Sequence, residues 1–260
     1  MMETPVLSIV SPCCNEQENL IPLVTAIRET LDPLHIAYEI VIGDDHSSDD
    51  SWKILQTLGA ADRRIRAVRL SQNHGQSAAV WAGIQAATGH FIATLDADLQ
   101  NHPRELPRLL EAIQRDQCDC VCGSRVAARA QGDSRVYQAT SKFANGIRNR
   151  FTHEKVSDSA CGYRIFRREC ATRLKFFKGM HRFMPTLFRI EGFVVTELPI
   201  SHHKRLTGKS HYGVLNRLFV TLHDLLAVRW MQKRMFCYQV KEQINFPPSA
   251  TVELDRRRTG

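Results

Sequence analysis

Short apolar runs alternate with helix-like segments over the first 123 residues, and this alternation restricts the fold more than any other feature. The apolar runs have the length and composition of buried strands, and they cover residues 6–10, 39–43, 65–70, 91–95 and 119–123. Apolar residues at helical spacing cover residues 18–31, 48–58, 76–88 and 103–115. This order predicts an α/β fold in which a mostly parallel, Rossmann-like sheet carries helices on both faces.

Polar residues follow four of the predicted strands. They are Asn15 and Glu16, Asp44 and Asp45, Asn73 to Gly75, and Asp96 and Asp98. Ligands of such sheets bind beyond the carboxyl ends of the strands. Polar residues without a shared function would be scattered over both ends, so their placement predicts a ligand site at one edge.

Asp96 and Asp98 lie directly after the apolar run 91–95. Two carboxylates held this close repel each other unless a cation lies between them. Hard cations such as Mg²⁺ or Mn²⁺ take oxygen ligands and bring phosphate oxygens with them. A solvated loop with two aspartates is the alternative, and the surrounding polar residues favour the metal site.

Composition narrows the choice of partner. The formal charge of +8 suggests an anionic partner, which is a nucleic acid, a phosphorylated ligand or a membrane surface. No glycine-rich dinucleotide turn or phosphate-binding loop is found in the sequence, which argues against a nicotinamide dehydrogenase or a P-loop enzyme. No signal peptide is recognised, so the eight cysteines are expected as reduced thiols in the cytoplasm.

The second half of the chain is more basic. A basic loop leading into a helix is predicted for residues 124–149, and a second basic cluster covers residues 202–211. Residues 214–235 predict an amphipathic helix, which either packs on the core or lies on a membrane surface. No apolar stretch is long enough to span a bilayer. Residues 236–260 read as a polar tail.

Five stretches match the motifs of a known family in order. Residues 11–19 (SPCCNEQEN) are similar to I-P-x-Y-N-E-x-x-N, 43–49 (GDDHSSD) to V-D-D-x-S-x-D, 96–103 (DADLQNHP) to D-A-D-L-Q-x-x-P, 158–164 (DSACGYR) to D-x-T-S-G-F-R, and 205–210 (RLTGKS) to R-x-x-G-x-S. Over about residues 5–235 the chain resembles the inverting family-2 glycosyltransferases of GT-A fold. It is most similar to the polyprenyl-phosphate branch, typified by dolichol-phosphate mannose synthases.

The resemblance implies a role for each matching residue. The catalytic set would be Asp158, Asp98 and Arg125, and the metal ligands would be Asp96, Asp98 and Gln100. The nucleotide-sugar would contact Pro12, Asn15, Glu16, Asp44, Asp45, Gly75, Asp96 and Arg205. The acceptor phosphate would contact Ser141, Arg135, Arg164 and Lys209. Residues 1–235 would then form one glycosyltransferase domain, with a nucleotide-binding half (1–123) and an acceptor-binding half (124–235).

The chain departs from the family pattern at three positions. Cys14 replaces the aromatic residue after the first strand, Tyr137 replaces an arginine, and His211 replaces a lysine. The transmembrane helices of many relatives are not found in this sequence. Cys14 removes a flat surface against the base, and Tyr137 leaves Arg135 as the substitute for the missing arginine at the acceptor.

The resemblance implies a Mg²⁺- or Mn²⁺-dependent enzyme that moves a sugar from a UDP- or GDP-linked donor to a polyprenyl phosphate. It would work as a peripheral protein at the cytoplasmic face of the membrane. A phosphate monoester is already anionic at neutral pH, so Asp158 is expected to orient the sugar rather than to take a proton. The alternatives are a transferase for a soluble saccharide or protein, a catalytically inactive relative, and a basic nucleic-acid-binding module. No nucleic-acid motif supports the last of these.

Overall fold

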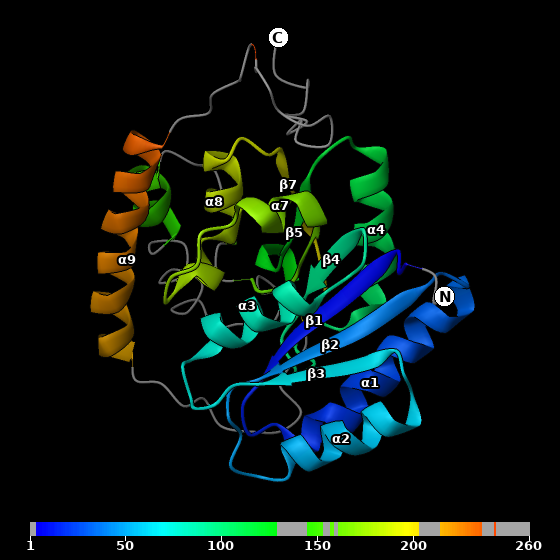
Figure 1. The fold of residues 1–260 in the computed structure, drawn as a ribbon. Coiled ribbons are helices and arrows are strands. Elements are labelled where there is room, and N and C mark those ends of the chain that lie inside the picture. The colour runs from blue at the N-terminus through cyan, green and yellow to red at the C-terminus, as the bar shows by residue number, and fades with distance from the viewer. Residues whose placement is uncertain are drawn as a thin grey trace.

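A sheet of seven strands runs through the protein in the order β3-β2-β1-β4-β6-β5-β7 (Figure 1). The computed structural model describes residues 4–128, 145–152, 157–158, 161–202, 214–235 and 242, and only the backbone of residues 214–222. The strands are β1 (Leu7–Cys13), β2 (Tyr38–Asp44), β3 (Ile65–Arg69), β4 (Phe91–Thr94), β5 (Cys120–Ser124), β6 (Arg164–Arg167) and β7 (Val195–Pro199). Every described pairing is parallel except those of β6, which runs antiparallel to β4 and β5.

Helices cover both faces of this sheet (Figure 1). The longer ones are α1 (Gln17–Leu31), α2 (Ser51–Ala61), α3 (Gln76–Ala86), α4 (Leu106–Arg115) and α9 (Val214–Arg234). The shorter ones are α7 (Arg168–Arg173), α8 (Met184–Ile190), η1 (Asp32–Leu34), η2 (Pro103–Glu105) and η3 (Met180–Arg182).

Two apolar cores lie on opposite faces of the sheet. One joins the sheet to α1, α2 and α4, and it includes Leu23, Leu55 and Leu109. The other joins the sheet to α3, α8 and α9, and it includes Val80 and Phe188. Since strands β1 and β2 are covered on both faces, their residues are buried almost throughout, and most of them are apolar, as is typical of parallel sheets.

Helix α3 lies directly on β2. A Cβ atom at Gly43 would stand 2.1 Å from the carbonyl oxygen of Ala79. This clash is with a backbone atom, so a side chain at position 43 would force the helix away from the strand. The absence of a side chain at Gly43 therefore sets the depth of α3, and with it the position of the first residues of this helix beside the sheet edge.

The predicted α/β class with a mostly parallel sheet and helices on both faces is confirmed. Strand β6 was not predicted, because Arg164 and Arg167 bound a run of only two apolar residues. The predicted helix 214–235 is found as α9. Of the predicted basic loop, residues 129–144 lie outside the described residues. The two halves of the domain remain a prediction.

Helix α9 packs on the body of the protein, and its use at a membrane surface remains a prediction. Leu225 and Val228 are buried against the body of the protein, whereas Leu226 and Trp230 are 52% and 62% exposed. Within the described part of the chain, no helix has both the length and the apolarity that crossing a membrane requires.

Candidate active site

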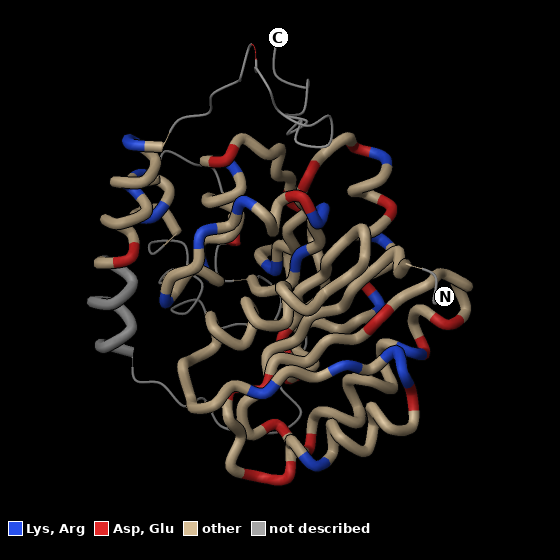
Figure 2. Tube along the Cα trace, in the orientation of Figure 1, with Lys and Arg blue, Asp and Glu red and all other residues tan. Residues whose placement is uncertain are grey.

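The loops after β1 and β2 are joined at the carboxyl edge of the sheet. Asn15 has a left-handed backbone (φ 57°), and its side-chain oxygen accepts hydrogen bonds from the amides of Ser48, at 2.8 Å, and Asp49. The amide of Glu16 donates to Ser51 Oγ at 2.9 Å. Pro12 precedes this loop, paired with Gly43 in the β1–β2 ladder. Acidic residues continue from this junction towards α2 (Figure 2).

Asp44 and Asp45 stand side by side but serve different parts of the edge. Asp44 is fully buried, bonds the hydroxyl and amide of Ser47, and pairs with Arg69 Nε at 3.2 Å. Asp45 accepts hydrogen bonds from the amides of His74, at 2.7 Å, and Gly75, at 2.8 Å. Asp45 therefore ties the loop that precedes α3 to the end of β2.

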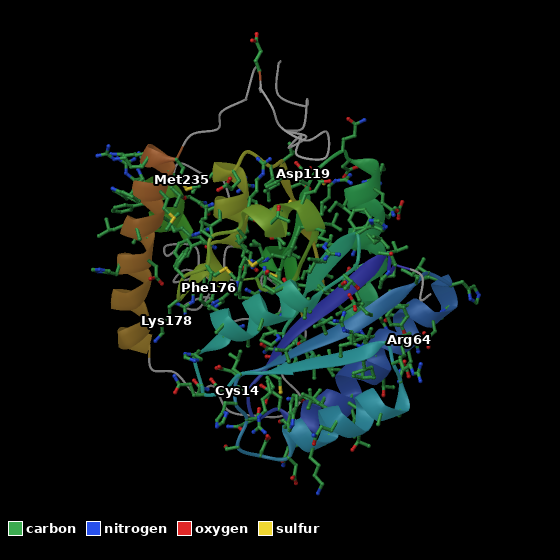
Figure 3. All side chains as sticks on the ribbon, in the orientation of Figure 1. Cys14, Arg64, Asp119, Phe176, Lys178 and Met235 are labelled. Atoms are coloured by element: carbon green, nitrogen blue, oxygen red, sulfur yellow. The ribbon has the colours of Figure 1, made fainter. Side chains whose placement is uncertain are left out.

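Cys14 lies where these loops meet, at the opposite end of strands β1–β3 from Arg64 (Figure 3). Its thiol is partly exposed and lies 3.4 Å from Asn73 Nδ2, which also donates to the carbonyl of Asp45 at 3.2 Å. Burial, followed by the charges of Asp45 and Asp44, raises the pKa of Cys14 above its usual value.

Asp96 and Asp98 follow β4 at the same edge. Gln76, the first residue of α3, donates to Asp96 Oδ1 at 3.0 Å. The amide of Gln100 donates to Asp98 Oδ1 at 3.2 Å, and Leu99 between them has a left-handed backbone (φ 55°). A Cβ atom at Gly162 would stand 3.0 Å from Asp96 Oδ2, so this glycine leaves room for the carboxylate.

This donor set fits a hard divalent cation. Two carboxylates and the side-chain amide of Gln100 lie on one tight turn, and oxygen is the ligand that Mg²⁺ and Mn²⁺ prefer. The described residues contain no cluster of three or more histidine, cysteine, aspartate or glutamate side chains suited to a metal. A cation bound at this turn would need further oxygen ligands.

Arg125 and Asp158 form a buried ion pair beside the Asp96 turn. Arg125 Nε and Nη2 donate to the two carboxylate oxygens of Asp158 at 2.7 and 2.9 Å, and the Arg125 amide donates a third hydrogen bond at 3.1 Å. Burial opposes the charge of Arg125, but the bonds to Asp158 and the charge of Asp96 outweigh it and raise its pKa. The guanidinium of Arg125 therefore stays charged.

Glu197 on β7 holds the segment that carries Asp158. Its carboxylate accepts the amide of Ser157 at 3.0 Å and that of Asp158 at 3.4 Å. Ser157 Oγ also lies 2.8 Å from Ser124 Oγ at the end of β5. The position of Asp158 is thus fixed from two strands.

A small pocket lies next to Asp96, between the ends of β1, β4 and β6 and the start of α3. Its lining includes Gln76, Asp96, Arg164 and His181. Arg164 is buried and donates to the carbonyl oxygens of Cys161 and His181. Its Nε has no hydrogen-bond partner among the described residues.

Comparisons with known proteins show the family of this chain. The sequence model described as "Glycosyl transferase family 2" matches residues 8–174. The chain belongs to glycosyltransferase family 2. The matched residues carry β1 to β6, and with them the loops at the carboxyl edge, Asp96, Asp98, Arg125 and Asp158.

Curated relatives of this family-2 glycosyltransferase include two polyprenyl-phosphate enzymes. The dodecaprenyl-phosphate galacturonate synthase of Rhizobium johnstonii is 32% identical over 87% of this chain and 67% of its own length. The undecaprenyl-phosphate 4-deoxy-4-formamido-L-arabinose transferase of Sodalis glossinidius is 35% identical over 87% of this chain and 69% of its own length. The predicted family and enzyme class are confirmed.

Solved structures share the fold at low sequence identity. Glucosyl-3-phosphoglycerate synthase from Mycobacterium tuberculosis, solved with Mn²⁺, UDP and phosphoglyceric acid, aligns with a TM-score of 0.65 at 16% identity over 90% of this chain and 80% of its own. The mannosyltransferase PcManGT from Pyrobaculum calidifontis, in complex with GDP-Man and Mn²⁺, aligns with a TM-score of 0.58 at 15% identity over 89% and 65%.

The glycosyltransferase fold brings most of the predicted site residues to one edge. The described ones are Pro12, Asn15, Glu16, Asp44, Asp45, Gly75, Asp96, Asp98, Gln100, Arg125, Asp158 and Arg164. Their individual roles remain predictions. Arg135, Ser141, Arg205 and Lys209 lie outside the described residues.

Three residues at the site were not predicted. Gln76 begins a predicted helix at the correct edge, so the rule that located Asp96 could also have found it. His181 and Glu197 carry no such signal, because their positions depend on β6 and β7, which join distant parts of the chain.

Proposed function

We propose that this glycosyltransferase moves a sugar from a nucleoside-diphosphate sugar to a polyprenyl phosphate. The observation that carries the proposal is the Asp96–Asp98 turn beside the buried Arg125–Asp158 pair, at the carboxyl edge of a family-2 domain. The two curated relatives are named for polyprenyl-phosphate acceptors. UDP and GDP-Man in the structural neighbours support a nucleotide donor.

The donor would lie along the edge in two parts. Its nucleoside would rest against the joined loops that contain Cys14, Asp45 and Gly75. Its diphosphate would lie over Asp96, Asp98 and Gln100, where Mg²⁺ or Mn²⁺, when bound, neutralises the charge that develops on the leaving diphosphate. The Mn²⁺ in both structural neighbours supports this cation.

Arg125 would contribute a fixed positive charge next to the leaving group. Its guanidinium is held in place by Asp158 before any substrate arrives, so little reorganisation accompanies the reaction. Asp158 accepts three hydrogen bonds from Arg125. This arrangement favours a role in holding Arg125 and the sugar over a role as a proton acceptor.

The acceptor would approach from a membrane. Leu226 and Trp230 on α9 are exposed, and Lys233 and Arg234 follow them. An exposed apolar stripe flanked by basic residues suits an anionic bilayer surface. Arg135, Ser141, Arg205 and Lys209 remain the proposed contacts for phosphates, and the cytoplasmic face remains the proposed location.

A donor screen tests the function. Radiolabelled UDP-glucose, UDP-galacturonate, UDP-N-acetylglucosamine and GDP-mannose are each incubated with undecaprenyl phosphate and Mn²⁺, and label is counted in the organic phase. We expect label from at least one donor, none with undecaprenol, and none after EDTA. Transfer to phosphoglycerate or to a soluble saccharide, with none to the lipid phosphate, would reject the lipid acceptor.

A further inference from the structure

His181 projects into the pocket beside Asp96 from a segment that three hydrogen bonds hold in place. The amide of Gly179 donates to Ser77 Oγ at 2.8 Å, and Ser77 Oγ lies 2.7 Å from His181 Nδ1. Arg164 Nη1 donates to the carbonyl of His181 at 2.9 Å. The ring is therefore fixed against α3 on one side and β6 on the other.

These bonds also determine which ring nitrogen carries the proton. Enclosure by the protein, then the charges of Arg182 and Arg164, lower the pKa of His181 to about 3, so the imidazole is neutral at pH 7. Ser77 Oγ already accepts the Gly179 amide, and its hydroxyl has no other acceptor among the described residues. The hydroxyl therefore donates to His181 Nδ1, and the single ring proton lies on Nε2.

Two residues that line the pocket each carry an N–H donor without a protein acceptor in the described part of the chain. One is His181 Nε2–H, on a ring that lines the pocket. The other is the buried Nε–H of Arg164. Of the two, only the Arg164 nitrogen is fully buried, whereas His181 is half-buried and lines the pocket, so its N–H is the donor that a ligand oxygen in the pocket can meet.

The position of the pocket indicates which part of a nucleotide-sugar reaches it. The proposed nucleoside loops follow β1, β2 and β3, whereas the pocket extends from the end of β1 to β4 and β6, away from β2 and β3 in the sheet order. Asp96, one of the proposed diphosphate-side ligands, lies between the two regions. The group beyond the diphosphate in this direction is the sugar.

We propose that His181 Nε2–H donates a hydrogen bond to an oxygen of the transferred sugar, and that Ser77 is the positioning residue that fixes this tautomer. The inference rests on the proposed function, because it assumes a nucleotide-sugar donor. It assigns His181 to the sugar and leaves the nucleoside diphosphate to other residues.

Calorimetry with Mn²⁺ tests this assignment on the full chain. The dissociation constants of UDP, UDP-glucose and UDP-galacturonate are measured, together with those of GDP and GDP-mannose, for wild type and three variants. His181→Phe keeps an aromatic ring but removes the Nε2–H. His181→Gln keeps an N–H donor at a similar distance from the backbone. Ser77→Ala removes the bond to Nδ1 together with the acceptor of the Gly179 amide.

We expect His181→Phe to increase the dissociation constant of the nucleotide-sugar about tenfold, which is the effect of losing one hydrogen bond. The dissociation constant of the matching nucleoside diphosphate should change by less than about twofold. His181→Gln should restore most of the sugar affinity, and Ser77→Ala should weaken it by about threefold. If His181→Phe does not fold, as judged by its thermal transition, Ser77→Ala and His181→Gln still test the proposal. For each of them, the change in nucleotide-sugar affinity is compared with the change in affinity for the matching nucleoside diphosphate.

Equal loss of both affinities, or no loss in either, would overturn the role of His181 while leaving the glycosyltransferase proposal intact. Failure of the wild-type protein to bind any of the five nucleotides would reject the donor site itself, and the role of His181 with it.

Discussion

The guanidinium of Arg125 and the carboxylate of Asp158 face each other through two side-chain hydrogen bonds, of 2.7 and 2.9 Å, and both residues are almost completely buried. Arg125 follows β5, whereas Asp158 precedes β6 by a few residues. This pair therefore closes the site on the side away from the nucleoside loops. It also explains how one positive charge stays beside Asp96 in a poorly solvated position.

Removing one member of this pair should destabilise the protein strongly. Asp158→Asn leaves the Arg125 charge buried without its partner, and breaking buried pairs costs about 3–5 kcal/mol. The double variant Arg125→Met/Asp158→Asn should lose less than the sum of the single variants. Urea unfolding of all four proteins in a double-mutant cycle measures the coupling. The exposed pair Arg115 and Asp116 serves as the control cycle, in which we expect no measurable coupling.

The variant Asp158→Asn also tests whether Asp158 acts as a base. If Asp158 only holds Arg125 and the sugar, the remaining activity of Asp158→Asn should not increase with pH between about 7.5 and 9, where the acceptor phosphate is already ionised. A pH–rate profile on folded protein measures this. Activity that recovers steadily as hydroxide increases would identify Asp158 as the base.

Asp45 should control nucleotide affinity through the loop before α3. Its carboxylate accepts the amides of His74 and Gly75, and Asp45→Ala leaves both amides without an acceptor. We expect the dissociation constant of UDP or GDP, whichever binds, to increase by about tenfold, because hydrogen bonds to charged groups contribute about 1.5–3 kcal/mol. Asp116→Ala, at the opposite end of the sheet, should leave the affinity unchanged. Unchanged affinity in Asp45→Ala would separate this loop from nucleotide binding.

Cys14 should report nucleotide binding through its thiol. It is partly exposed, whereas the six other described cysteines are buried, and burial raises the pKa of the neighbouring Cys13 to about 12. Limited treatment with N-ethylmaleimide at pH 8 should label Cys14 before Cys13, and saturating nucleotide with Mn²⁺ should slow the labelling. Peptide mass spectrometry quantifies both thiols, and Cys14→Ser is the control. Labelling of Cys14 that nucleotide leaves unaffected would place the nucleoside elsewhere.

Asp62 should make the free energy of unfolding depend on pH in the acidic range. Burial opposes its charge, but hydrogen bonds from Arg64 and Arg28 outweigh this and lower the pKa of Asp62 to about 2. Because the folded value lies below the unfolded value of about 3.9, the stabilisation is present above pH 4 and is lost as the pH falls towards 2. We expect about 1–2 kcal/mol from this group, after allowing for the partly exposed Arg64.

Urea midpoints at pH 7 and pH 3 for wild type and Asp62→Asn measure this contribution. The wild-type protein should lose more stability than the variant between the two pH values. An equal loss in both proteins would show that other carboxylates cause the acid sensitivity.

The sequence predicted which residues lie at the carboxyl edge of the sheet, but not which side chains contact one another there. Strands β1 to β5 follow from apolar runs, and the placement of Asp45 and Asp96 follows from the ends of those runs. Residues 164–167 gave no strand signal, because β6 is stabilised by its neighbours β4 and β5 and not by its own four residues. The pairing of Arg125 with Asp158 depends on the position of β6, and the bonds from Glu197 depend on the pairing of β7 with β5, so local patterns could not indicate them.

Asp44 illustrates the same limit. Its position at the end of β2 suggested a ligand contact, which remains a prediction, and the structure shows that the side chain is fully buried and bonds Ser47 and Arg69. Sequence patterns place a residue at an edge without showing whether its side chain points outward or supports the loop from within.

The central claim is that a divalent cation at Asp96 and Asp98 holds the diphosphate of the donor. Electron-nuclear double resonance on the Mn²⁺-loaded protein, with UDP and in a second sample GDP, measures it through the hyperfine coupling between Mn²⁺ and ³¹P. We predict a strong phosphorus coupling in wild type and in Asp116→Asn, and its loss in Asp98→Asn. Persistence of the wild-type coupling in Asp98→Asn, or its absence from wild type with both nucleotides, would contradict the account.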